Sequence, residues 1–175
     1  MAADFITQMK LRNDLWNFAL QFYGQAGVET LCLKLQNDYE LSINRLLLAC
    51  WAGTVGKTLV LDNFSSPAEA WQREVTHLVR AARYRVRRAK VEQHELDGCY
   101  NALRQAELAC EQVELSMLYA SAESLEQNAF CLSNVEYNLG LYLQSADQPI
   151  SCSLEEDLQA LIRAVDDFMA SKARG

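Results

Sequence analysis

Residues 66–90 read SPAEAWQREVTHLVRAARYRVRRAK, a stretch with both a helix start signal and a helical repeat. Ser66 is placed to cap a helix, Pro67 suits its first position, and Glu69 completes a capping box. At about 100° per residue, seven apolar side chains fall within one arc of about 100°, which we expect to face the core. They are Trp71, Val75, Leu78, Val79, Ala82, Val86 and Ala89. The stretch therefore predicts a long amphipathic helix.

A second face of this helix is basic. The stripe that we call the basic ridge consists of Arg73, Arg80, Arg83, Arg87 and Lys90. From Pro67 to Lys90 there are seven Lys and Arg against Glu69 and Glu74, a local charge of +5 in a chain of net charge −7. A plain helical domain does not require such a separation of charge, so the ridge is the candidate functional surface.

Three shorter helices are predicted before this stretch. The first starts near Asn13 and places Leu15, Phe18 and Phe22 on one face, and Gly24 and Gly27 end it. The second starts at Val28 and ends near residues 37–38. The third is capped by Ser42, contains three consecutive leucines that imply burial on more than one side, and is expected to end at Gly53 and Gly56. Residues 58–61 are expected to be a packed connection.

Downstream, the sequence predicts two or three further helices. One has a heptad seam of small residues, with Glu107, Glu111 and Glu114 beside it as an acidic ridge. The seam residues are Cys99, Leu103, Ala106, Cys110, Val113, Met117 and Ala120. The next helix restarts at Ser124 or continues the previous one, and its inward residues are Leu125, Ala129, Leu132, Val135, Leu139 and Tyr142. A capping box at Ser153 opens the last helix.

We therefore expect an all-α fold. With 175 residues, half of them apolar and only nine Gly and Pro, the chain suits one helical domain. We predict a single-domain bundle over residues 1–175 of six or seven mostly antiparallel helices, in which the first three form a cap on the longer fourth to sixth. Residues 1–12 and 171–175 are expected to be frayed.

The sequence also predicts a cytoplasmic protein without a disulfide framework. Residues 1–10 lack a signal-peptide pattern, and no apolar run is long enough to span a membrane. Four of the six cysteines fall on apolar helical stripes, so we expect them to be buried thiols. They are Cys32, Cys50, Cys99 and Cys110.

The three tryptophans are expected to pack in the core and not to form a binding surface. They are Trp16, Trp51 and Trp71.

Two short motifs resemble catalytic or metal sites without completing them. Residues 53–58, GTVGKT, end like a phosphate-binding loop, but Trp51 stands where that motif needs its first glycine. Glu74 and His77 have the spacing of a di-iron ligand pair, but a second such pair is missing from the sequence. No pattern indicates a nucleophile with its base. We expect no enzyme activity, no cofactor and no metal.

Three interpretations of the basic ridge remain open. It could pair with the acidic ridge of an antiparallel neighbour, bind an acidic protein, or contact the phosphates of RNA or DNA. Residues 91–175 contain four Lys and Arg against fifteen Asp and Glu, and this charge repels a polyanion from most directions. We therefore expect a non-enzymatic interaction or adaptor domain whose ridge holds an acidic protein partner. RNA or ribosome association through the same ridge is the alternative.

The N-terminal half resembles a proteobacterial family of small proteins of unassigned function. The resemblance rests on residues 15–20 (LWNFAL), Tyr23, 27–28, 32–33, 35–36, Asn44, 46–48, Trp51, Gly53, Trp71, 74–75, Leu78 and the arginine-rich end of the fourth helix. It covers residues 15–90 well. It implies a bacterial cytoplasmic helical domain and no reaction, cofactor or catalytic residue.

Overall fold

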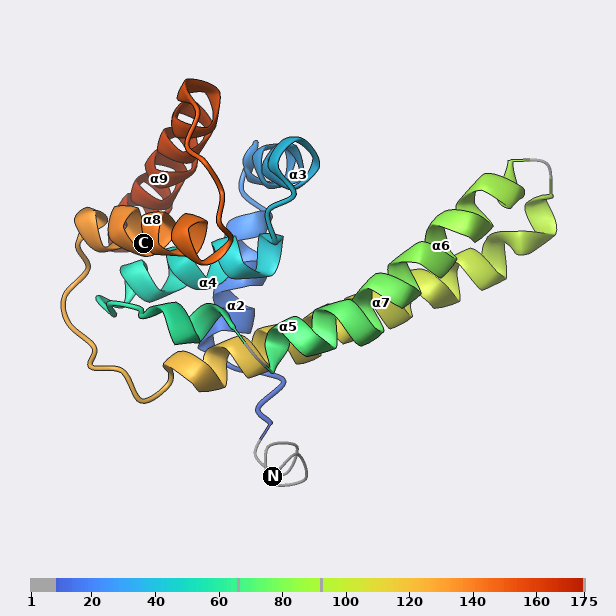
Figure 1. The fold of residues 1–175 in the computed structure, drawn as a ribbon, viewed down its shortest axis with the longest axis horizontal. Coiled ribbons are helices and arrows are strands. Elements are labelled where there is room, and N and C mark those ends of the chain that lie inside the picture. The colour runs from blue at the N-terminus through green and yellow to red at the C-terminus, as the bar shows by residue number, and fades with distance from the viewer. Residues whose placement is uncertain (1–8, 66, 92, 175) are drawn as a thin grey trace.

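The protein is an all-helical head from which a two-helix arm projects (Figure 1). The computed structural model describes residues 9–65, 67–91 and 93–174. Within these residues no strand is present and seven helices have at least 10 residues, which confirms the predicted all-α bundle. They are α2 (Asp14–Tyr23), α3 (Val28–Tyr39), α4 (Ile43–Thr54), α6 (His77–Lys90), α7 (Asp97–Ala122), α8 (Leu132–Ser145) and α9 (Cys152–Ala173). None of the helices described is long and apolar enough to cross a membrane.

Helix α2 forms because its first turn is capped and its apolar residues repeat at helical spacing. Asn13 Oδ1 accepts a hydrogen bond from the backbone N–H of Trp16 at 2.8 Å, which satisfies a donor of the first turn. Phe18 and Phe22 are buried, and each ring centroid lies 5.6 Å from that of Phe168 in α9. The predicted start and core face of this helix are confirmed.

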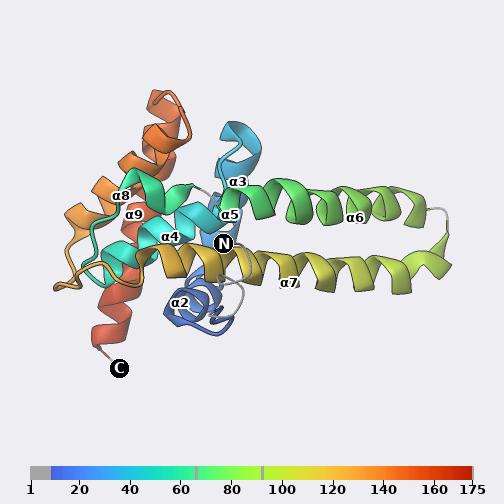
Figure 2. The ribbon, with the colours of Figure 1, turned by 60° about the horizontal axis from the view of Figure 1, so that its bottom comes forward.

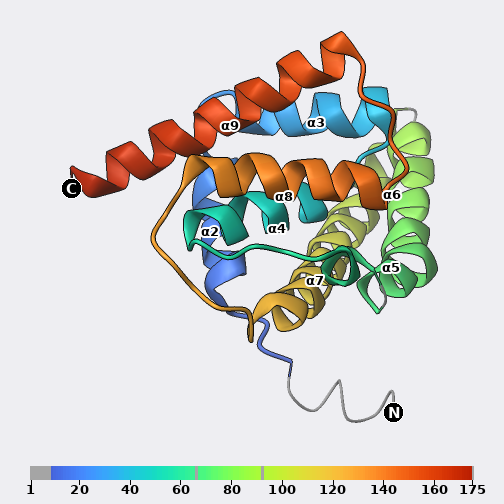
Figure 3. The same ribbon diagram turned by 60° about the vertical axis from the view of Figure 1, so that its left-hand side comes forward.

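Helix α4 is the centre of the head. Every residue from Arg45 to Thr54 is buried, because α8 packs along α4 and α7 and α2 contact it as well (Figure 3). Gly53, which we expected to end the helix, lies inside it instead. A Cβ at Gly53 would overlap the Val135 side chain and lie 2.8 Å from the Val135 backbone nitrogen. Glycine there therefore allows α4 and α8 to approach closely.

The arm is an antiparallel helical hairpin (Figure 2). One side is a continuous helix made of α5 (Ala68–Trp71), the π-helical turn η2 (Gln72–Thr76) and α6. The short 3₁₀ turn η3 (His94–Leu96) precedes α7, which runs back along α6 and then into the head. Ser66, the expected cap of the first side, lies outside the described residues.

The predicted core stripe of residues 71–89 holds only in part after the π-helical turn. Val79, Ala82 and Val86 are half-buried, but the other two stripe residues are not. Leu78 is 64% exposed, Ala89 is exposed, and α6 has no buried residue. A π-helical turn has one residue more than an α-helical turn, so the residues after it are rotated by about 100° from the regular pattern. As a consequence Arg83 turns toward α7, where its side chain is only 15% exposed.

The predicted heptad seam of α7 is only partly buried. Leu103, Cys110 and Val113 are half-buried, and Ala120 is exposed. Met117 is buried where α7 enters the head, whereas Cys99 and Ala106, on the arm, are exposed. The arm has two helices and no third layer to cover them, so small seam residues stay open to solvent. Of the four cysteines expected to be buried, Cys32 and Cys50 are buried and Cys110 is half-buried.

Helices α7 and α8 are separate. Residues 123–131 are not helical, so Leu125 and Ala129 precede α8 and do not lie on it. Val135, Leu139 and Tyr142 are buried on α8 as expected, but this helix lies in the head against α4 and not beside the arm (Figure 3).

The capping prediction for the last helix is wrong by two residues. Ser151, not Ser153, accepts a hydrogen bond from the Leu154 N–H at 3.2 Å. Helix α9 continues through residues 171–173, part of the terminal stretch that we expected to fray.

Candidate functional site

Two arginines of the basic ridge are bound inside the arm. Arg80 Nε donates to Glu107 Oε1 at 2.7 Å, and Arg80 Nη2 donates to Glu111 Oε1 at 2.7 Å. Arg83 Nε donates to the second carboxylate oxygen of Glu107, and Arg83 Nη2 lies 3.4 Å from the first. These contacts join α6 to α7. The interpretation of the ridge as an ion-paired surface therefore applies to Arg80 and Arg83.

The charges of this network stabilise one another. Burial alone would raise the pKa of Glu107, but hydrogen bonds and charge attraction from Arg83 and Arg80 outweigh it and hold that pKa below its ordinary value. Hydrogen bonding to Glu107 is also the largest cause of the raised pKa of Arg83. The pKa of Glu111 is raised, because burial outweighs its attraction to Arg80. Glu107 is consequently the anionic centre of the arm.

The other members of the basic ridge lie in different surroundings. Arg73 pairs with its neighbour Glu74 at 2.7 Å, and both side chains are exposed. Lys90 Nζ lies 2.6 Å from Asp97 Oδ1 and 4.7 Å from the centroid of the Tyr100 ring. Arg87 is exposed and forms no ion pair with any described residue. The five residues therefore do not form one free surface.

Four exposed arginines on the arm have no ion-pair partner among the described residues. We call them the arm arginines: Arg85, Arg87, Arg88 and Arg104. Sequence reasoning had singled out only Arg87 of these four as a site residue. Arg85 and Arg88 lie on another face of α6, and Arg104 lies on α7. The ion pairs Arg83–Glu107 and Lys90–Asp97 set the register of the hairpin, which the sequence does not fix, and both arginines lie between these two pairs along the arm.

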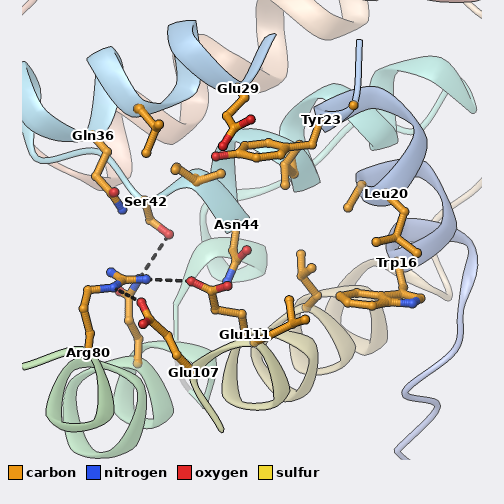
Figure 4. Close-up of a pocket in the computed structure, with 18 of the residues that line it drawn as sticks. Trp16, Leu20, Tyr23, Glu29, Gln36, Ser42, Asn44, Arg80, Glu107 and Glu111 are labelled. Atoms are coloured by element: carbon orange, nitrogen blue, oxygen red, sulfur yellow. Dashed lines mark hydrogen bonds and ion pairs between the residues drawn. The ribbon is translucent and has the colours of Figure 1, made fainter. Parts of the chain in front are cut away.

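A cleft opens where the arm meets the head. It has a cavity volume of about 410 Å³ and is lined by α2, α3, the start of α4, and the arm. We call it the elbow cleft. Figure 4 shows Trp16, Leu20 and Tyr23 of α2 on one side, and Arg80 with Glu107 and Glu111 on another. The cleft is therefore apolar on the head side and charged on the arm side.

The apolar part of the elbow cleft includes large side chains that are open to solvent. Leu20 is 58% exposed and Leu108 is 47% exposed, and Leu33 and Tyr84 are also exposed lining residues. Trp16 is half-buried and packs against the core, as expected, and it also lines the cleft. The sequence could not show this grouping, because four separate helices contribute to it.

A buried polar cluster lies at the start of α4, next to the cleft. Arg45 Nε donates to the Phe64 carbonyl at 2.8 Å, and Arg45 Nη1 donates to Gln72 Oε1 at 3.0 Å. The same Nη1 lies 3.4 Å from Glu114 Oε1. Gln72 Nε2 donates to Ser42 Oγ at 3.2 Å. The cluster thus ties α4 to the π-helical turn and to α7, so its role is to fix the arm to the head.

The residues that resemble a phosphate-binding loop have a structural role. Lys57 is buried, and its Nζ donates to the carbonyls of Ala122 and Glu123 at 2.9 and 2.7 Å. It therefore satisfies the carbonyls at the end of α7. Gly56 has a φ of 67°, and a Cβ there would lie 2.6 Å from the Ala129 carbonyl oxygen. No phosphate contact is needed to explain either residue.

The second motif does not form a ligand pair. Glu74 is bound to Arg73, and His77 is exposed. In the part of the chain that the structure describes, no group of three or more His, Cys, Asp and Glu side chains is placed to hold a metal ion.

Comparison with known proteins gives a family and no activity. Residues 14–118, more than half of the chain, match the model of a family described as "Protein of unknown function (DUF2390)". This stretch contains the arm and every residue that lines the elbow cleft, and it excludes α8 and α9. No curated protein and no solved structure matches the chain.

Proposed function

The chain belongs to the DUF2390 family, whose function is unassigned, and we propose that it is a non-enzymatic interaction domain that holds an acidic protein on its arm. The observation that carries this proposal is the set of four exposed arm arginines, which have no ion-pair partner among the described residues, on a chain of net charge −7. The ridge residues Arg80 and Arg83 support binding indirectly, because their contacts with Glu107 fix the helix that presents the arm arginines.

The contrast between paired and unpaired arginines supports this proposal. Glu107 and Glu111 bind Arg80 and Arg83 inside the arm, whereas no described carboxylate meets the arm arginines. A single exposed ion pair contributes only about 0.2–1 kcal/mol, so useful affinity requires several arginines that act together. Positive charge on an otherwise acidic protein also steers an acidic partner to the arm.

RNA or ribosome association through the same arginines is the second candidate. Arginines at one-turn spacing on a helix suit contacts with phosphates, which is what favours it. The negative charge of residues 91–175 opposes it, because a long polyanion that extends past the arm meets fifteen Asp and Glu against four Lys and Arg. An acidic protein needs to contact the arm alone, so we favour the protein partner.

The cytoplasmic location expected from the sequence remains a prediction. All six cysteines lie in described residues and are free thiols. Free thiols are usual in reducing compartments, and this supports the prediction.

Affinity purification from the cells that make the protein tests the proposal. The arm variant combines Arg85→Glu, Arg87→Glu and Arg88→Glu, and the head control combines Arg12→Glu, Arg163→Glu and Arg174→Glu, which changes the net charge equally at exposed positions. We expect an acidic protein to co-purify with the wild type and the head control and to be lost from the arm variant. Circular dichroism verifies that both variants fold.

Two outcomes contradict the proposal. Identical companions for all three proteins show that the arm arginines do not bind the partner. Loss of the companions after nuclease treatment, with ribosomal proteins among them, supports the RNA alternative instead.

A further inference from the structure

We propose that the elbow cleft is the anchor pocket for this acidic partner, and that it accepts a large apolar side chain from a segment whose carboxylates bind Arg87 and Arg104. The inference rests on the proposed function and adds the form of the partner's binding segment. The occupant is a peptide segment of another protein, with a leucine or aromatic residue followed by acidic residues.

The elbow cleft has the size and lining of a pocket for an apolar group. Its volume of about 410 Å³ falls within the range of about 300–1,000 Å³ typical of ligand pockets. Four of the large apolar side chains exposed on the described surface line this one cleft. They are Leu20, Leu33, Tyr84 and Leu108. A cluster of exposed apolar side chains rimmed by charge indicates an interaction site.

The charged wall of the cleft does not favour a small anion. Arg80 and Arg83 are already bound to Glu107 and Glu111, so an incoming anion would have to displace a carboxylate that is itself half-buried or buried. The Arg83 guanidinium also lies 4.6 Å from the centroid of the Tyr84 ring, which holds this part of the wall in place. What the cleft leaves unfilled is its apolar side.

The arm continues from the cleft with unpaired positive charge. Arg87 follows Tyr84 by three residues and Arg83 by four, so it lies one helical turn farther out on the same face of α6. Arg104 precedes Leu108 by four residues and Glu107 by three, so it lies one turn farther out on α7. Both arginines are exposed and unpaired among the described residues.

Two contacts between the helices set the register from which we infer that Arg87 and Arg104 lie at similar positions along the arm. Arg83 binds Glu107 on the cleft side, and Lys90 binds Asp97 nearer the tip of the arm. Arg87 lies between Arg83 and Lys90 on α6, and Arg104 lies between Glu107 and Asp97 on α7. The surface therefore changes from an apolar pocket to a pair of arginines within about one helical turn, a rise of about 5.4 Å along the arm. An apolar residue followed by acidic residues complements it.

A displayed library of random peptides tests the inference on the full chain. The peptides that the wild-type protein enriches from the library are the probes. Their affinities are then measured for the wild type and for three variants. Leu20→Gln with Leu108→Gln removes apolar surface from the cleft, and Arg87→Gln with Arg104→Gln removes the charge. Leu78→Gln with Ile150→Gln is the control, because both residues are exposed and neither lines the cleft.

We expect the enriched peptides to combine a large apolar residue with acidic residues. Their affinity should fall by about tenfold or more for the cleft variant, the effect of losing one buried apolar side chain. It should also fall for the arginine variant and stay unchanged for the control.

Different results overturn the inference and the proposed function. If the peptides bind the cleft variant as tightly as the wild type but lose affinity for the arginine variant, the anchor pocket is wrong and the arm arginines still bind an acidic partner. If the arginine variant binds as tightly as the wild type, the proposed function fails as well. A library that yields no enriched peptide overturns the anchor pocket, and the affinity purification above then decides the function separately.

Discussion

At the scale of single residues, the most unusual group is the buried carboxyl of Glu114. Its side chain is inaccessible to solvent, and it meets Arg45 at 3.4 Å. Burial raises the pKa of Glu114 to about 7, because it outweighs the opposite influence of Arg45. Glu114 Oε2, Arg45 Nη2 and Thr76 Oγ1 have no hydrogen-bond partner among the described groups. The Glu114 carboxylate therefore binds a proton more readily in the folded protein than it would in water.

The raised pKa predicts how stability depends on pH. Between the ordinary value of 4.5 and about 7, the folded protein holds a proton on Glu114 that the unfolded chain has lost. The stability that this proton contributes is present at low pH and is lost as the pH rises through this window, and it is on the order of 3 kcal/mol in total. Glu114→Gln, which is neutral at every pH, should remove the Glu114 contribution and leave the dependence of the same sign that the raised pKa of Glu111 gives.

Urea unfolding at several pH values within this window measures the effect. Glu136→Gln, at an exposed position on α8, is the control and should keep the wild-type dependence. The lowered pKa of Glu107 acts in the opposite direction and at lower pH, where its stabilising charge is lost as the pH falls. If Glu114→Gln shows the same slope as the wild type between pH 4.5 and about 7, the account of Glu114 is wrong.

Sequence reasoning placed many individual core residues correctly but not their polar partners. Leu15, Phe18 and Phe22 follow from helical spacing, because a helix that packs on a core buries its apolar stripe. Glu114 was grouped with Glu107 and Glu111 on the same basis, yet it binds Arg45, a residue in an apolar helix far away in the sequence. Only the packing of α4 on α7 brings the two together.

At the scale of helices, α4 and α8 approach each other closely at Gly53. We expect Gly53→Ala to destabilise the protein by about 1–3 kcal/mol, because the added methyl group overlaps Val135 and its backbone. Gly140→Ala on α8 is the matched control. A Cβ there meets no atom within 4 Å, so this change should stabilise the helix by up to about 1 kcal/mol.

Thermal or urea unfolding compares the two variants. A Gly53→Ala protein as stable as the wild type would mean that α4 and α8 are not in this close contact. A destabilised Gly140→Ala protein would mean that its position in α8 is wrong.

Helical periodicity predicted which helices exist but not every face that they bury. The stripe from Trp71 to Ala89 assumes the same rotation per residue throughout, and the π-helical turn at residues 72–76 breaks this assumption. Gln72 within that turn binds Arg45 and Ser42, so tertiary contacts hold the irregular turn against the head. On the helix that follows this turn Leu78 is exposed and Arg83 turns inward.

At the scale of the whole molecule, the head and the arm have different roles. The head contains the apolar core built around α4, and the arm presents charge with little core of its own. The excess positive charge of residues 67–90 was evident from the sequence, and Arg87 is the one ridge residue that is also an arm arginine. Arg104 and the elbow cleft could not be predicted, because they depend on the register of the hairpin and on the placement of α2 and α3 beside it.

Site-specific photo-crosslinking in living cells tests most directly whether the arm holds an acidic protein. A photo-crosslinking amino acid at Ala89 keeps all the arm arginines, and the same amino acid at Ala170 on α9 is the control at another exposed alanine. We predict that the Ala89 position links to an acidic protein and that the Ala170 position does not. Links from Ala89 to RNA or ribosomal proteins, or the same products from both positions, would contradict the account.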